Sequence, residues 1–313
     1  MLDCAIIGGG PAGLTAGLYA TRGGLKNVTL FDSGVIGGQI TKSSEIENYP
    51  GFFDNSKTGL EFMETWQKQC FAFGLKHEFK KIERVEKTGE YFTISIEGGE
   101  SVEALTVIVA TGSTPKRAGF KGEDDFFGKG VSTCATCDGF FYKDKPVTVL
   151  GGGDTALEEA FFLSNICSDV YVVHRRDEFR AAPPTLDRAM RKENIHLITN
   201  SVIDEAYGGM MGLDGVKIKN TKTNEVTDIA NTGLFVFVGL NVNNGVLKDE
   251  NGEFICTMND RGQVVVNLSM HTSLKGLFVA GDLRIEAPKQ VVSAAGDGSI
   301  AALQVISYLQ ELA

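Results

Sequence analysis

The residues best suited to carry out chemistry lie together in the middle of the chain. Residues 134–139 read Cys-Ala-Thr-Cys-Asp-Gly, so two thiols are three positions apart. On the first turn of a helix this spacing places both sulfurs on one face, near the positive end of the helix dipole, where a thiol pKa falls from about 8.5 towards about 7. We therefore expect Cys134 and Cys137 to be a redox-active pair. Asp138, which follows directly, is expected to move the proton that thiol chemistry requires.

Two other interpretations of this spacing are half of a zinc site and chance. A structural zinc site needs four ligands, usually from two such pairs. This chain has no second Cys-x-x-Cys motif, and its four histidines are scattered. These facts favour redox chemistry, and no metal site is predicted. The other cysteines lie far apart in apolar surroundings and are expected to be buried free thiols: Cys4, Cys70, Cys167 and Cys256.

A glycine-rich loop near the N-terminus indicates a dinucleotide site. Residues 8–13 read Gly-Gly-Gly-Pro-Ala-Gly. The pattern predicts a strand over 2–7 before the loop, a helix over 14–21 after it, and a second strand over 28–31. Gly-x-Gly-x-x-Gly between a strand and a helix is typical of dinucleotide binding, and a glycine-rich turn without a ligand is the alternative.

The positions of this loop have separate roles. Gly8 allows the tight turn, Gly10 lets a pyrophosphate approach the backbone, and Gly13 lets the helix pack on the strand. The N–H groups at the start of the helix would bind the pyrophosphate. Asp32, at the end of the second strand, is placed to bind a ribose hydroxyl.

A second loop of the same kind is followed by different chemistry. Residues 151–156 read Gly-Gly-Gly-Asp-Thr-Ala; strands are predicted over 147–150 and 170–173, with a helix over 155–165 between them. The second strand ends not in an acid but in His174-Arg175-Arg176, with Arg180 close behind. An acid would repel a 2′-phosphate, whereas arginine binds it. The site is therefore predicted to prefer NADP(H) to NAD(H), and a solvated basic turn is the alternative.

The two loops and a length of 313 residues suggest two domains. The predicted fold class is α/β, with two Rossmann-like, three-layer dinucleotide-binding domains. Small-residue turns at 112–115 and 239–241 separate the segments 1–112, 113–241 and 242–313, and the last is expected to complete the first domain. In that last segment Asp282 ends a buried strand, where it could bind a ribitol hydroxyl, and a helix is predicted over 289–312.

Charge and hydropathy exclude several kinds of partner. Thirty Lys and Arg against 40 Asp and Glu give a net charge of −10, and binding to nucleic acid would need a basic face. No apolar run reaches the roughly 18 residues of a membrane helix, and the apolar start of the chain is interpreted as a strand, not a signal peptide. We expect a cytoplasmic protein with no membrane or nucleic-acid partner. An NADP(H) site needs an electron acceptor, and a flavin is the natural one.

Seven motifs together resemble one family over the full length of the chain, the low-molecular-weight, bacterial-type thioredoxin reductases. The motifs are residues 8–13, Gly37-Gly38-Gln39, Glu47-Asn48-Tyr49-Pro50-Gly51, residues 134–142, residues 151–156, His174-Arg175-Arg176-Asp177 with Arg180, and Gly281-Asp282. One departure is Lys289-Gln290-Val291, which stands where many members carry Arg-Gln-Ala.

The resemblance implies a homodimeric flavoenzyme of the pyridine nucleotide-disulfide oxidoreductase class II type, which reduces the disulfide of thioredoxin with NADPH through FAD. It implies that Cys137 lies next to the flavin, that Cys134 attacks thioredoxin, and that Asp138 is the acid/base. It also implies a domain rotation with hinges at 112–115 and 239–245.

The same resemblance, with the loop analysis, assigns the cofactor contacts. The residues expected at FAD are Gly8, Gly10, Pro11, Ala12, Gly13, Asp32, Gly38, Gln39, Asn48, Thr111, Gly112, Asp282, Lys289, Gln290 and Val291. The residues expected at NADPH are Gly151, Gly153, Asp154, Thr155, Ala156, His174, Arg175, Arg176 and Arg180.

Three other functions fit parts of the pattern. A ferredoxin or flavodoxin NADP reductase shares the fold but typically lacks the cysteine pair. The alkyl hydroperoxide reductase flavoprotein carries an added N-terminal disulfide domain. A non-catalytic flavin-nucleotide binding protein would bind FAD without disulfide-dependent oxidation of NADPH.

Overall fold

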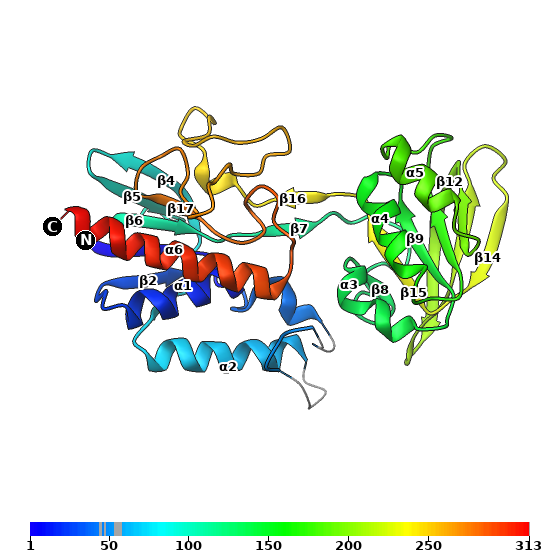
Figure 1. Cartoon of the computed structure of the whole chain (residues 1–313), viewed down its shortest axis with the longest axis horizontal. Helices are drawn as coiled ribbons and strands as arrows, with labels where there is room; N and C mark the ends of the chain where they lie inside the picture. The colour runs from blue at the N-terminus through cyan, green and yellow to red at the C-terminus, as the bar shows by residue number, and fades with distance from the viewer. Residues whose placement is uncertain (44–45, 47, 53–57, 313) are drawn as a thin grey trace. The chain divides into compact units, whose positions relative to one another are not determined.

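The chain folds into two compact units (Figure 1). The computed structural model describes residues 1–43, 46, 48–52 and 58–312. The first unit consists of Met1–Thr114 and Val242–Ala313, and the second of Pro115–Asn241. The first unit thus extends two residues beyond the predicted boundary at 112, and its C-terminal segment joins its N-terminal segment. Which cofactor each unit binds stays a prediction.

The first unit is built on a seven-stranded sheet with strand order β3-β2-β1-β6-β5-β4, in which β17 also pairs with β6. The strands β1, β2, β3, β6 and β17 run parallel, and the hairpin β4–β5 joins β6 in antiparallel pairing. Their bounds are β1 Leu2–Ile7, β2 Val28–Phe31, β3 Lys76–Glu78, β4 Ile82–Thr88, β5 Tyr91–Ile96, β6 Ser101–Val109 and β17 Leu277–Val279.

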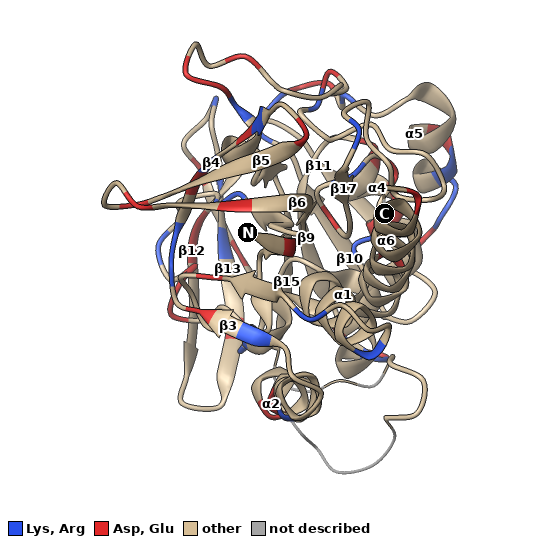
Figure 2. Ribbon diagram, turned by 90° about the vertical axis from the view of Figure 1, so that its left-hand side faces the viewer, with Lys and Arg blue, Asp and Glu red and all other residues tan. Residues whose placement is uncertain are grey.

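The described residues of this unit form three long helices: α1 Pro11–Arg22, α2 Gly59–Ala72 and α6 Val291–Leu312. Helix α1 begins three residues earlier than predicted because proline suits the first position of a helix, where its missing N–H costs nothing. Helix α2 begins with a capping box, in which Thr58 and Glu61 bond each other's backbone N–H groups. Helices α1 and α6 lie side by side in both views (Figures 1 and 2). Short 3₁₀ turns, η1 Gly38–Lys42 and η3 Gly245–Leu247, complete the unit.

Apolar side chains cover both faces of this sheet, which explains the nearly continuous apolar runs of its parallel strands. Ile6, Leu30 and Ile108 face the helices, where they pack with Leu14 of α1. Their neighbours in sequence, such as Ile7, Phe31 and Val109, face the opposite side, under the β4–β5 hairpin and residues 247–266.

The second unit has a five-stranded parallel sheet of order β11-β10-β9-β15-β8. The helices cover one face, and a three-stranded antiparallel sheet, β12-β13-β14, covers the other. The strands are β8 Val131–Ser132, β9 Val147–Gly151, β10 Val170–Val173, β11 Ile195–Ile198, β12 Ser201–Gly209, β13 Gly212–Asn220, β14 Val226–Ala230 and β15 Gly233–Phe237. The helices are α3 Ala135–Asp138, η2 Gly139–Tyr142, α4 Asp154–Leu163 and α5 Pro183–Met190.

The two connections between the units form a small sheet of their own, in which β7 Ser113–Pro115 pairs with β16 Leu240–Val242. The predicted α/β class with two dinucleotide-type domains is confirmed. None of the helices formed by the described residues combines the length and the apolar character that crossing a membrane requires.

Candidate active site

Cys134 and Cys137 are joined by a disulfide bond in the second unit. Cys134 is the residue before α3, Cys137 lies within it, and both side chains are partly exposed. The helix is a single turn, closed by the N–H of Asp138 donating to the carbonyl of Cys134 at 3.1 Å. The predicted first-turn geometry is therefore present, although this helix is only four residues long and its dipole is correspondingly small. The Thr136 hydroxyl lies 3.5 Å from the Cys134 sulfur.

Asp138 has the properties of a proton donor. Burial raises the pKa of its carboxyl group, and a hydrogen bond from the Ser132 hydroxyl opposes this shift. Tyr142 lies close to it, and its own pKa is raised to about 12, first by burial and then by the charge of Asp138. Burial therefore favours the protonated form of this carboxyl group, which directly follows the disulfide in the sequence.

The second glycine loop leaves one side open. It lies between β9 and α4, at the carboxyl end of the strand. A Cβ atom on Gly152 would lie 2.1 Å from Nδ1 of His174, whereas one on Gly153 would meet nothing within 4 Å. Thr155 and Ala156 form the first turn of α4. This arrangement has room for a pyrophosphate at the backbone of Gly153 and at the N-terminus of the helix.

The basic segment after β10 is tied to this loop by its backbone. The N–H of Arg180 donates to the carbonyl of Gly152 at 2.7 Å, and the N–H of Ala182 donates to Oδ1 of Asp154 at 2.7 Å. The side chains of Arg175, Arg176 and Arg180 are exposed. The segment that carries the three predicted arginines is therefore joined to the loop at Arg180 and Ala182, and whether the arginines bind a phosphate stays a prediction.

His174 is placed differently from the arginines that follow it. Its side chain is only 5% exposed, and its ring lies under Gly152 and stacks on Phe179 with 5.1 Å between centroids. Its Nε2 atom is hydrogen-bonded to the carbonyl of Glu178 at 3.1 Å. Burial lowers its pKa, the Glu178 bond opposes this, and the three arginines lower it further. The ring thus packs under the loop, and its lowered pKa favours the neutral form.

The first glycine loop is shaped by two very close backbone contacts. Gly8 has φ 106°, and a Cβ atom there would lie 2.5 Å from the carbonyl oxygen of Ala110. A Cβ atom on Gly13 would lie 1.9 Å from the carbonyl oxygen of Gly8. Gly10 is open, since the nearest atom to a Cβ there is the Cα of Gly38 at 4.0 Å. The open position lies where the pyrophosphate was expected, between the first loop and the turn η1, which also carries Gln39.

Asp32 anchors this loop to the end of β2. Its Oδ2 accepts the N–H of Gly9 at 2.5 Å, and its Oδ1 accepts the N–H of Gly34 at 2.6 Å. Pro11 and Ala12 begin α1 directly after the loop. The carboxylate is therefore held beside the glycines, with a further lone pair on each oxygen for a ribose hydroxyl.

Two predicted contacts from opposite ends of the chain meet in this unit. Nδ2 of Asn48 donates to Oε1 of Gln290 at 3.2 Å, across 242 positions of sequence. Tyr49, the next residue, is packed between Phe62 and Trp66 of α2, with centroids at 5.2 and 5.4 Å. This aromatic cluster fixes the segment to α2. Glu47, of the same motif, lies outside the described residues.

Asp282 follows β17 and is a second carboxyl group with a raised pKa. Burial is the main cause and raises its pKa to about 6. The positive charges of Lys289 and Arg284 lower the pKa, and the negative charge of Asp297 raises it. Lys289 is exposed with φ 57°, and Val291 begins α6, two residues later than predicted.

A buried ion pair, which the sequence patterns did not reveal, lies beside Asp282. Arg284 donates from Nε to Oδ2 of Asp297 at 2.6 Å and from Nη2 to Oδ1 at 3.0 Å. The side chains are 16% and 8% exposed. Oδ2 of Asp297 also accepts the N–H of Gly281 at 3.1 Å. The pair therefore joins the 281–284 loop to α6. The available sequence signal was an acid among small and apolar residues in the first half of this helix.

Asn243 is another residue that the sequence analysis missed. Its N–H donates to the carbonyl of Gly112 at 3.1 Å, and its Nδ2 donates to the carbonyl of Thr111 at 2.9 Å. Its carbonyl accepts the Thr111 hydroxyl at 2.6 Å, and its Oδ1 accepts the Thr114 hydroxyl at 3.2 Å. One asparagine thus holds the two connecting segments of the first unit together and positions Thr111 and Gly112.

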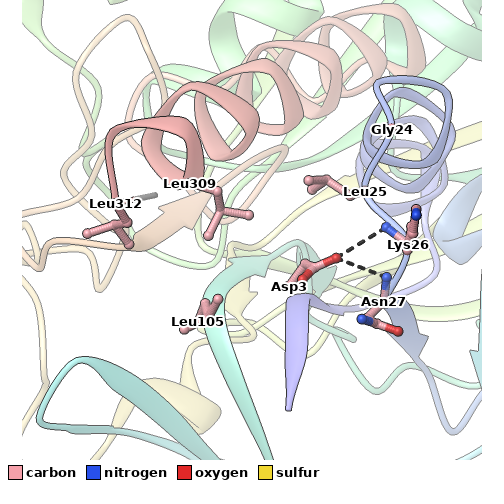
Figure 3. A pocket seen from close by; sticks show the side chains of 8 residues that line it. All are labelled: Asp3, Gly24, Leu25, Lys26, Asn27, Leu105, Leu309 and Leu312. Atoms are coloured by element: carbon pink, nitrogen blue, oxygen red, sulfur yellow. Dashed lines mark hydrogen bonds between the residues drawn. The ribbon is translucent and has the colours of Figure 1, made fainter.

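A cavity of about 520 Å³ in the first unit is separate from these residues (Figure 3). Its lining includes Asp3, Lys26, Leu105 and Leu309. Asp3 accepts the N–H groups of Lys26 and Asn27 at 3.1 and 3.0 Å, at the amino ends of β1 and β2. Ligands of such sheets bind at the carboxyl ends of the strands, so we do not assign this cavity to the site. Within the described residues no cluster of His, Cys, Asp and Glu suits a metal ion.

Comparisons with known proteins show which family the chain resembles in sequence and fold. The family model "Pyridine nucleotide-disulphide oxidoreductase" matches residues 2–298. A thioredoxin reductase of Helicobacter pylori is 59% identical over 310 residues, which is 99% of each chain. The crystal structure of thioredoxin reductase from Streptococcus pyogenes superposes with a TM-score of 0.93 at 38% identity, over 99% of each chain. A thioredoxin reductase from Giardia duodenalis gives 0.91 at 35% identity, over 98% of each chain.

Proposed function

Because the chain belongs to the thioredoxin reductases of the pyridine nucleotide-disulphide oxidoreductase family, we propose that it reduces the disulfide of thioredoxin with electrons from NADPH, by way of FAD. The observation that carries this proposal is the Cys134–Cys137 disulfide with Asp138 directly beside it. The disulfide lies in the same unit as a glycine loop and an arginine cluster suited to NADPH. A ferredoxin or flavodoxin NADP reductase has no need of that pair.

The first unit fits FAD in three respects. The backbone at Gly10 is open to a pyrophosphate, and a side chain at neighbouring Gly38 would crowd it, with its Cβ 3.2 Å from the Cα of Gly10. The Asp32 carboxylate beside this loop suits a ribose. Asp282 and the Asn48–Gln290 pair offer polar groups for the ribitol and the ring. When bound, FAD would supply a two-electron carrier between nicotinamide and disulfide.

The second unit fits NADPH better than NADH. Arg175, Arg176 and Arg180 follow β10 at the position where an acid would select NADH. The bonds from Arg180 and Ala182 fix their segment to the phosphate loop. A guanidinium contact to a phosphate contributes about 1.5–3 kcal/mol, so two contacts suffice for a preference of roughly a hundredfold or more.

The residues of the cysteine turn perform the disulfide chemistry. Two electrons break the Cys134–Cys137 bond, and Asp138 donates its proton to the sulfur of Cys137, which leaves Cys134 as a thiolate. The Cys134 thiolate then attacks one sulfur of thioredoxin, forming a mixed disulfide and releasing the other sulfur as a thiolate. Cys137 returns its proton to Asp138 and attacks Cys134, which restores the intrachain disulfide and releases the second thioredoxin sulfur as a thiolate. The two thioredoxin thiolates take up protons from water.

An anaerobic dithionite titration tests this function. Beside the native holoenzyme, the control is Cys137→Ser, which cannot form the disulfide. We expect two electron pairs per chain for the native protein and one for the variant, followed by thioredoxin-dependent oxidation of NADPH. One pair for both would remove the disulfide from the electron path and favour a ferredoxin-type reductase. A colourless protein after flavin reconstitution would contradict every flavin-based function.

The family resemblance further supports a homodimer that works in the cytoplasm; both stay proposals. Sedimentation equilibrium of the holoenzyme tests the assembly, and a mass of a single chain at micromolar concentration would contradict it.

A further inference from the structure

The two glycine loops are bonded to the segments after their second strands in opposite ways. In the first unit the carboxylate stands at the end of the strand, where Oδ2 of Asp32 accepts the N–H of Gly9 in the loop at 2.5 Å. In the second unit the carboxylate stands in the loop, where Oδ1 of Asp154 accepts the N–H of Ala182, in the segment after β10, at 2.7 Å. The bond is of the same kind, but the acid has changed sides.

The side on which the acid stands decides which ribose can bind. An acid at the end of the strand binds the ribose hydroxyls and repels a 2′-phosphate. Asp32 directly follows β2, whereas the residue directly after β10 is His174. Asp154 is the first residue of α4, so it joins loop and segment without placing a negative charge at the end of the strand.

The segment that Asp154 bonds is irregular and needs fixing points. Residues 174–182 lie between β10 and α5 and carry three exposed arginines. The start of the segment is held by the strand beside β10, since the N–H of His174 donates to the carbonyl of Ile198 at 2.8 Å. The carbonyl of Arg176 accepts the N–H of Asn200 at 2.9 Å. These bonds leave the other end of the segment, around Arg180, to be fixed by the glycine loop.

Two bonds fix that other end, and Asp154 makes one of them. The N–H of Arg180 donates to the carbonyl of Gly152 at 2.7 Å, and two residues later the N–H of Ala182 donates to Asp154. Helix α5 begins directly after Ala182 with two prolines, whose fixed φ angles make its start rigid. A long arginine side chain loses conformational freedom when it binds a phosphate, and a backbone that is already fixed lowers this cost.

We propose that Asp154 is a positioning residue for NADPH, whose carboxylate holds the arginine segment against the glycine loop and so raises the preference for a ligand with a 2′-phosphate. This inference rests on the proposed function, and it gives Asp154 a role through the arginines in place of direct contact with the nucleotide. The charge of Asp154 acts on the 5′-phosphates, which NADPH and NADH share. Its bond to Ala182 acts on the segment that would bind the 2′-phosphate, so the two effects are separable.

The test measures binding of adenosine 2′,5′-bisphosphate and of 5′-AMP to the FAD-loaded holoenzyme by titration calorimetry. The two probes differ only in the 2′-phosphate, and their binding needs no electron transfer. Asp154→Ala removes both the charge and the acceptor, whereas Asp154→Asn removes the charge and keeps an acceptor oxygen. Ala182→Pro removes the donor and keeps the charge; Ala182 has φ −57° and ψ 142°, a conformation that proline adopts.

For Asp154→Ala and Ala182→Pro we expect the preference for the bisphosphate to fall by roughly three- to tenfold. This is the range of one ordinary hydrogen bond, which suits a bond at the protein surface. Asp154→Asn should keep the native preference. So should the control Asp187→Ala, which removes an exposed carboxylate of α5.

Two results would overturn the proposal. An equal loss of affinity for both probes in Asp154→Ala would mean that Asp154 maintains the loop as a whole. A preference as low in Asp154→Asn as in Asp154→Ala would mean that the charge acts and not the bond. If Asp154→Ala did not fold, Ala182→Pro beside Asp154→Asn would give the same comparison.

Failure of the proposed function is distinguishable. A native holoenzyme that binds both probes equally would contradict NADPH as the electron donor, and with it the preference that Asp154 is proposed to raise. A native preference that Asp154→Ala and Ala182→Pro both retain would refute the role of Asp154 alone. A preference that falls in these two variants, in an enzyme that does not reduce thioredoxin, would support the role of Asp154 and contradict the function.

Discussion

The buried pair of Arg284 and Asp297 should be among the most sensitive positions of the first unit. Asp297→Ala removes the partner of a guanidinium that is only 16% exposed, and it also removes the acceptor of the Gly281 N–H. Breaking a buried ion pair from one side costs about 3–5 kcal/mol, since it leaves an uncompensated charge. The loss should release the loop that carries Asp282, so we expect weaker retention of FAD as well as lower stability.

The assay is urea unfolding of the holoenzyme, followed by flavin fluorescence, at one fixed concentration of free FAD. The concentration must be fixed because bound FAD itself adds to the apparent stability. The matched control replaces both partners, as Arg284→Met with Asp297→Leu. Exchanging a buried pair for apolar residues of similar size is often neutral or stabilising, so the double variant should unfold at a higher urea concentration than Asp297→Ala.

Two results would refute this reasoning. An Asp297→Ala protein within about 1 kcal/mol of the native free energy of unfolding would mean that the Arg284 charge is solvated or paired elsewhere. A double variant as unstable as Asp297→Ala would mean that the stability depends on packing around α6 and not on the charge left behind.

Three further predictions follow from the two glycine loops and the last segment. Arg176→Ala should lower kcat/KM for NADPH by about 10- to 100-fold, since one contact contributes about 1.5–3 kcal/mol, and should leave kcat/KM for NADH little changed. Steady-state assays test this, with Arg191→Ala as the control at another exposed arginine. An equal loss for NADPH and NADH would contradict phosphate binding. Gly13→Ala should destabilise the protein by at least about 1–3 kcal/mol and reduce its FAD content, because its Cβ would lie 1.9 Å from a carbonyl oxygen, whereas Gly296→Ala, with nothing within 4 Å, should be tolerated in the same thermal melts. The pKa of Asp282 is raised to about 6, so between about pH 4 and pH 6 the folded state holds a proton that the unfolded state has lost. In FAD-free protein the free energy of unfolding should therefore fall as the pH rises from about 4 to about 6. Asp282→Asn should flatten this pH dependence in urea unfolding, and an unchanged slope would assign it to other groups.

The parts of the fold that the sequence predicted are those governed by local chemistry. The bounds of β1, β2 and β10 agree with the predicted strands because each is a short apolar run that ends at a glycine loop or a polar side chain. The predicted start of α1 was wrong by three residues, since the glycine pattern continued through Pro11 into the helix. The predicted helix over 155–165 likewise begins one residue earlier and ends two residues earlier, as α4 Asp154–Leu163.

The contacts that the sequence did not reveal join residues of ordinary type across long separations. Arg284 and Asp297 meet only because β17 and α6 pack together, and nothing in either segment alone identifies the partner. Asn243 lies in a connection without regular pattern, yet it bonds residues 111–114. His174 was grouped with the arginines by its place in a basic run, whereas its burial depends on Gly152, 22 positions earlier.

The two loops also differ in how closely helix and strand approach, and this difference bears on their ligands. In the first loop Gly13 lies so near the carbonyl of Gly8 that no methyl group fits. In the second loop the equivalent position is Ala156. Its methyl group fits because the residue opposite it, Gly151, has no side chain; a Cβ atom on Gly151 would lie 2.6 Å from the Cβ of Ala156. Helix α1 therefore packs more closely on its loop than α4 does. Under the proposed function, the first loop would hold the resident dinucleotide. The second loop would hold the dinucleotide that leaves after each hydride transfer, and exposed arginines would supply much of its affinity through contacts that form and break with the phosphate.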